Sequence, residues 1–101
     1  MRWYDLEPSV CMAISLIELS DLSTQVRCAK YIIQRAKEVD PEMNFIKRAT
    51  AVNITITQYK RWYDKNETIS MAFRYLKELP KDAQITISNE IFNLLKEVSI
   101  A

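Results

Sequence analysis

The chain of 101 residues has no glycine and no histidine, and it has only two cysteines. Ordinary usage would supply about seven glycines in a chain of this length. Without glycine, the tight loops of dinucleotide-binding and P-loop proteins lack the residue that lets their backbone approach a phosphate. Without histidine, the chain lacks the commonest general base and the commonest zinc ligand. We therefore expect no catalytic site, no metal and no cofactor, and we predict that the protein is not an enzyme.

An excess of charge of one sign is also missing. Fourteen Lys and Arg face thirteen Asp and Glu, which gives a net charge of +1. The longest apolar stretch, residues 10–17, is too short to span a bilayer, and the acidic residues and proline before it do not suit a signal peptide. We expect a cytoplasmic protein with no membrane partner, in which Cys11 and Cys28 stay reduced. The alternative for this pair is a bridge between two packed helices.

The apolar and charged fractions are those of an ordinary globular protein. Apolar residues make up 49% of the chain and charged residues 27%, close to the averages for folded domains. The length suits one domain and leaves no room for a second core of ordinary size. We predict a single helical domain over residues 1–101.

An internal repeat is the most informative feature of the sequence. The letters RWYD at residues 2–5 recur at residues 61–64, and the same offset of 59 without a gap gives 11 identities in 38 aligned positions. Chance matching at average residue usage would give about two or three. We interpret residues 2–39 and 61–98 as two copies of one supersecondary unit.

Each copy has the apolar spacing of two amphipathic helices. In the first helix of each copy, apolar residues recur every three or four positions, and Asp5 and Asp64 are the expected N-caps. A short connection follows at residues 19–21 and again at 79–81. A second apolar stripe then continues to Ala36 in one copy and to Val98 in the other. We predict an antiparallel helical hairpin for each copy.

Residues 41–60 form a predicted central helix between the copies. Asp40 and Pro41 suit a helix start, and an apolar stripe continues to Tyr63. A two-stranded ribbon over residues 52–57 and 84–88 is the competing interpretation, because both segments alternate with period two and are rich in β-branched residues. Helix is favoured because the stripe is longer than either segment. The predicted fold is therefore all-α: a five-helix bundle in which two duplicated hairpins flank a central helix.

The repeated aromatic ends are the candidate partner-binding residues. Trp, Tyr and Arg dominate the energetics of many interfaces. The alternative role, packing at the end of each hairpin, is favoured because a small domain needs large aromatic areas in its core. The candidate residues are Arg2, Trp3, Tyr4, Arg61, Trp62 and Tyr63.

Basic side chains suggest a second kind of partner. In the second helix, Arg27, Lys30, Gln34 and Lys37 recur at three-four spacing, and the predicted central helix carries Lys47, Arg48, Lys60 and Arg61. Such a basic face would meet phosphates. A solvated helix face explains the same pattern, since acidic residues lie close by. The sequence names no partner or pathway. We expect a small cytoplasmic interaction module that binds protein, first of all itself; the alternative is a nucleic-acid-binding regulator.

Overall fold

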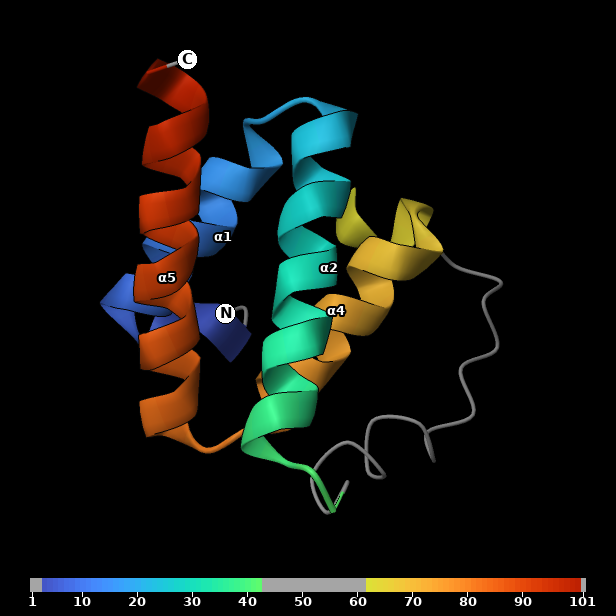
Figure 1. Ribbon diagram of the computed structural model, residues 1–101, viewed down its shortest axis with the longest axis vertical. Coiled ribbons are helices and arrows are strands. Elements are labelled where there is room, and N and C mark those ends of the chain that lie inside the picture. Colours follow the sequence, from blue (N-terminus) through green and yellow to red (C-terminus); the bar gives the residue numbers. More distant parts are fainter. Residues whose placement is uncertain (1–2, 43–61, 101) are drawn as a thin grey trace.

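The computed structural model describes residues 3–42 and 62–100, and this part of the chain is all-α (Figure 1). None of the helices in these residues combines the length and the apolar character that a bilayer crossing needs. The elements in chain order are η1 (Trp3–Leu6), α1 (Pro8–Glu18), α2 (Leu22–Val39), η2 (Trp62–Lys65), α4 (Glu67–Glu78) and α5 (Lys81–Ile100), where η marks a short 3-10 helix.

The first helix of each copy begins later than the sequence suggests. Glu7 and Asn66 are the N-caps, and their side chains accept hydrogen bonds from the backbone N–H groups of Ser9 and Ile69. The predicted caps, Asp5 and Asp64, are wrong, because the Trp-Tyr-Asp segment first forms a 3-10 turn in both copies. This turn places the cap two residues further along the chain.

Residues 3–42 and 62–100 contain four α-helices, at the places of the four helices of the two predicted hairpins. Asp40 ends α2 instead of starting a helix: its backbone N–H donates to the Ala36 carbonyl at 2.9 Å, and Pro41 and Glu42 form a turn. The rest of the predicted central helix over 41–60 lies outside the described residues. Residues 84–88, half of the alternative ribbon, are helical within α5.

Elements of the two copies recur at the offset that the sequence repeat has. η2, α4 and α5 each begin 59 residues after η1, α1 and α2. Gln25 Nε2 donates to the carbonyls of Ile17 and Glu18, both at 3.1 Å. Gln84 Nε2 donates to the matched carbonyls of Leu76 and Lys77 at 3.0 and 3.1 Å. Each glutamine thereby satisfies carbonyl groups at a helix end that lack partners within the helix.

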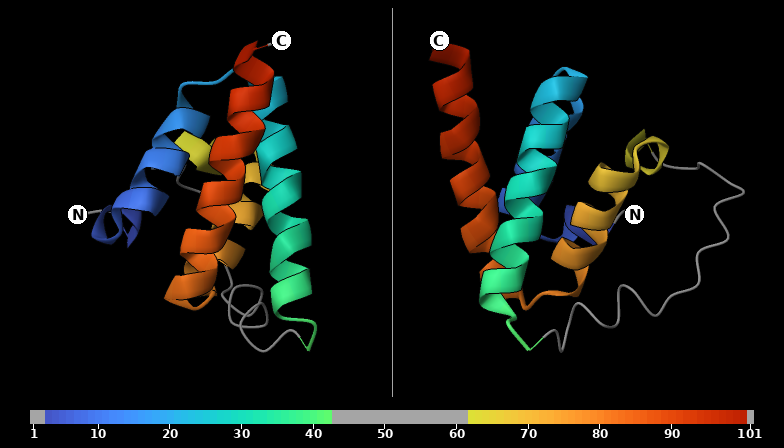
Figure 2. Two further views of the ribbon diagram at one scale, coloured as in Figure 1. Left: turned by 60° about the vertical axis from the view of Figure 1, so that its left-hand side comes forward. Right: turned by 45° about the vertical axis from the view of Figure 1, so that its right-hand side comes forward.

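The helices of one copy are not each other's main partners. α1 packs chiefly against α5, and α2 packs chiefly against α4, whereas α1 and α2 share a smaller contact. Figure 1 and the right-hand view of Figure 2 show α2 lying between α5 and α4. The prediction of two self-contained hairpins is therefore wrong: each main helix pair joins a helix of residues 8–39 to a helix of residues 67–100.

One apolar core results from this crossing, and all four α-helices contribute to it. Burying a single Ile, Leu or Phe side chain stabilises a fold by about 1.5–3 kcal/mol. Many buried positions correspond between the copies: Tyr4 with Tyr63, Val10 with Ile69, Ala13 with Ala72, Ile14 with Phe73, Ile17 with Leu76, Cys28 with Ile87, and Ile32 with Ile91.

Candidate functional site

The predicted aromatic site residues lie partly inside the protein. Tyr4 and Tyr63 are each only 2% exposed, and Trp3 and Trp62 are half-buried against the core. Arg2 and Arg61 lie outside the described residues. Each Trp ring meets the Tyr ring after it edge to face, with centroids 5.4 Å apart in η1 and 5.6 Å apart in η2. The two tyrosines are therefore packing residues, and the tryptophans are the accessible members of each end.

The two aromatic ends differ in their surroundings. Phe73 of α4 contacts both Trp62 and Tyr63, with ring centroids 5.5 and 4.7 Å apart. The matched position in α1 is Ile14, which provides no ring. Trp3 and Tyr4 instead line a cleft at the connection between α4 and α5. Trp3 and Tyr4 therefore border a cleft that Lys77 and Lys81 also line.

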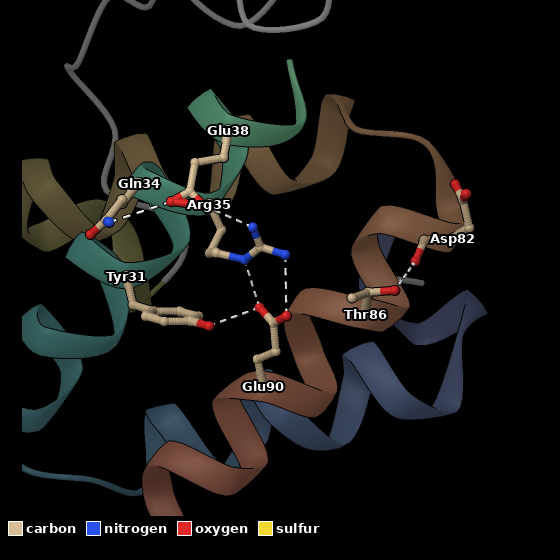
Figure 3. A network of polar contacts seen from close by, with 7 residues as sticks. All are labelled: Tyr31, Gln34, Arg35, Glu38, Asp82, Thr86 and Glu90. Atoms are coloured by element: carbon tan, nitrogen blue, oxygen red, sulfur yellow. Dashed lines mark hydrogen bonds and ion pairs between the residues drawn. The ribbon is translucent and has the colours of Figure 1, made fainter. Parts of the chain in front are cut away.

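A polar network joins α2 to α5 at a half-buried position (Figure 3). Arg35 donates from Nε and Nη2 to the two carboxylate oxygens of Glu90, at 2.8 and 3.2 Å, and from Nη1 to Glu38 at 2.9 Å. Tyr31 Oη donates to the same Glu90 carboxylate at 2.8 Å. Bidentate pairs of this kind are the stronger charge-assisted hydrogen bonds.

The network shifts the pKa values of its members in opposite directions. The hydrogen bonds from Arg35 hold the pKa of the Glu90 carboxyl below its ordinary value. Burial, followed by the hydrogen bond to Glu90, raises the pKa of the Tyr31 phenol. Because the Glu90 carboxylate is held by three donors, it is placed to tie two helices together rather than to accept a proton from a substrate.

The two thiols occupy different environments and form no bridge. Both cysteines are free. Cys28 is fully buried in the core, and burial raises the pKa of its thiol to about 11. Cys11 is half-buried, and its Sγ donates to Asp5 Oδ1 at 3.4 Å. A protonated buried thiol is a poor nucleophile, so Cys28 behaves as a small apolar core residue.

The basic side chains predicted for the second helix lie on the outer surface of α2. Arg27, Lys30 and Lys37 are all exposed, with exposed Gln34 between them. The other basic candidates, Lys47, Arg48, Lys60 and Arg61, lie outside the described residues. Within residues 3–42 and 62–100, no three His, Cys, Asp or Glu side chains lie close enough together to hold a metal ion.

An apolar surface on α1 was missed by sequence reasoning. Met12 and Leu16 of α1 are 56% and 37% exposed, Leu19, the C-cap of α1, is 83% exposed, and Leu22 at the start of α2 is 60% exposed. We call these four residues the α1 apolar face. No family model, curated protein or solved structure matches this chain.

Proposed function

We propose that the protein is a small cytoplasmic interaction module that self-associates through the α1 apolar face. The observation that carries the proposal is the exposure of Met12 and Leu16 on α1, and of its C-cap Leu19, while Val10, Ala13, Ile14 and Ile17 of the same helix are buried. The spacing of four and three residues between Met12, Leu16 and Leu19 places them in one stripe. Two free thiols suit a reducing compartment such as the cytoplasm.

The second copy supplies an internal comparison for this face. The positions that match Leu16, Leu19 and Leu22 hold Tyr75, Glu78 and Lys81. Tyr75 is buried and the other two are charged, so the same element carries a different surface in α4. Since the fold tolerates charge at the positions of Leu19 and Leu22, these two leucines call for an explanation beyond folding.

A second copy of this chain is the partner that the face fits. Residues 8–17 contain no charged side chain, and the exposed acidic residues Glu18 and Asp21 border the face only at its Leu19 and Leu22 end. The four side chains expose roughly 400 Å², within the usual size of the largest apolar patch on a monomer. A standard interface buries about 800 Å² on each partner, and somewhat more than half of it is apolar. A twofold dimer with the same patch on both subunits matches these quantities.

Sedimentation equilibrium over a wide range of protein concentration tests the self-association. We expect a monomer–dimer equilibrium for the unaltered chain. Leu19→Lys buries an unpaired charge at the interface and should weaken the dimer by about tenfold or more. Met71→Lys is the matched control, because Met71 is an exposed methionine on the corresponding helix of the other copy. The proposal is contradicted if the unaltered chain stays monomeric at the highest attainable concentration. It is also contradicted if Leu19→Lys and Met71→Lys weaken the dimer equally.

Duplication of one ancestral unit is part of the proposal. The 11 identities, the recurring element starts and the matched glutamine contacts support it. A further support is that Tyr31 and Glu90, which are matched positions, touch each other. A residue contacts its own counterpart only close to an axis that relates the two halves. An experimental structure in which α1 and α4 make different angles with the helices that follow them would contradict a common origin.

Nucleic-acid binding is the second candidate, and one observation favours it. Arg27, Lys30 and Lys37 form an exposed basic row along α2. Binding through phosphate contacts must weaken steeply as salt rises, and loss of each contact lowers the salt slope by about one. Retention on immobilised duplex DNA should then fall with salt and should be lost in Arg27→Gln/Lys30→Gln/Lys37→Gln. No retention at low salt removes this candidate.

A further inference from the structure

A cleft of about 350 Å³ lies where the first aromatic end meets the connection between α4 and α5. Pockets for small ligands begin at about this volume. The cleft joins parts of the chain that are more than seventy positions apart in sequence. Its lining residues are Trp3, Tyr4, Leu6, Glu7, Lys77, Leu79, Lys81 and Gln84.

The lining combines an apolar floor with positive charge. Trp3 and Leu79 contribute apolar surface, while Lys77 and Lys81 are exposed at the rim. Within the residues that the structure describes, neither lysine forms an ion pair. The one acidic residue of the lining, Glu7, caps α1 through a hydrogen bond from the Ser9 N–H at 3.5 Å. With two lysines and one glutamate, the lining has a net positive charge.

The repeat shows which parts of this lining the fold itself needs. Gln84 corresponds to Gln25, and both glutamines hold the end of the preceding helix, so Gln84 has a structural role. Lys77 and Lys81 correspond to Glu18 and Leu22. A helix end in this fold therefore does not require the two lysines, and their positive charge is particular to the cleft.

The geometry points to a binding site for a small organic carboxylate that carries a flat apolar group. The carboxylate would lie between the ammonium groups of Lys77 and Lys81, where charge-assisted hydrogen bonds form. The apolar group would lie against the Trp3 indole and Leu79, which removes its surface from water. This site lies apart from the α1 apolar face and does not depend on self-association.

Fluorescence of Trp3 tests the site. In Trp62→Phe, Trp3 is the sole indole, and Phe keeps an aromatic ring beside Phe73. The probe is phenylacetate, with phenylacetamide as its neutral counterpart and acetate as the anion without a ring. We expect saturable quenching by phenylacetate. Both controls should bind at least about tenfold more weakly, because phenylacetamide lacks the negative charge and acetate lacks the ring.

Substitution of the lysines separates the site from general charge effects. Lys77→Gln/Lys81→Gln should weaken phenylacetate binding by about tenfold or more, whereas Lys30→Gln, an exposed lysine on α2, should leave it unchanged. Any of three results overturns the inference: phenylacetamide binds as tightly as phenylacetate, Lys30→Gln weakens binding as much as Lys77→Gln/Lys81→Gln, or quenching by phenylacetate does not saturate. Should Trp62→Phe fail to fold, amide NMR shifts of Leu79 and Gln84 in the unaltered chain report the same titration, and their absence overturns it.

Discussion

The contact between Arg35 and Glu90 provides the sharpest test of how α2 and α5 are joined. Glu90→Gln removes the negative charge and keeps the side-chain shape, and Arg35→Met removes the positive charge and keeps an apolar stem. The two side chains are 26% and 30% exposed, and two short contacts join them. Exposed pairs contribute about 0.2–1 kcal/mol. This bidentate, half-buried pair should lie at the upper end, near 1 kcal/mol.

A double-mutant cycle measures that coupling free of other effects. The free energy of unfolding is obtained by urea denaturation at neutral pH for the unaltered chain, both single variants and the double variant. We expect a coupling energy of about 1 kcal/mol and a fall in Tm of about 4 °C or more for Glu90→Gln. Tyr31→Phe gives a second cycle through the hydrogen bond to Glu90. Additive effects of Arg35→Met and Glu90→Gln would show that the two side chains do not interact in solution.

Three further predictions follow from burial and charge. Arg35 lowers the pKa of Glu90, so the stabilisation by Glu90 is fully present above its unfolded pKa of about 4.3 and is lost as pH falls through the lower folded value. The difference in the free energy of unfolding between the unaltered chain and Glu90→Gln should therefore disappear in acid. A difference that does not change with pH would be inconsistent with the contact. A thiol reagent should modify Cys11 in the folded protein and Cys28 only on unfolding, since burial raises the Cys28 pKa to about 11; equal labelling rates would contradict the buried position. Phe73→Ala should cost about 3–5 kcal/mol, measured by urea denaturation with the exposed Met71→Ala as control, and similar costs for the two would contradict the core.

Apolar periodicity predicts helices, and the sequence offset of 59 matches the offset between the starts of corresponding elements. The three-four spacing of Val10, Ala13, Ile14 and Ile17 marks residues that are all buried in α1. The spacing does not predict which helix packs against these residues, because any apolar surface can bury an apolar stripe. For that reason the packing of α1 on α5 and of α2 on α4 had to come from the structure.

The helix starts and the cleft were missed for different physical reasons. Asp5 is a good cap residue, but the 3-10 turn over residues 3–6 moves the cap to Glu7. The cleft joins Trp3 to Lys77 and Lys81, and no local pattern links residues so far apart. One signal was present: the repeat replaces Glu18 and Leu22 by those two lysines, which marks a difference between otherwise matched ends.

The packing of α1 on α5 and of α2 on α4 is the central feature of this fold. Each of the four α-helices has at least one buried isoleucine, among them Ile17, Ile32, Ile69 and Ile91. Nuclear Overhauser effects between selectively labelled isoleucine methyl groups therefore measure the pairing directly. We expect the strongest cross-peaks between helices to join α1 with α5 and α2 with α4. Cross-peaks chiefly between α1 and α2, and between α4 and α5, would contradict the crossed packing.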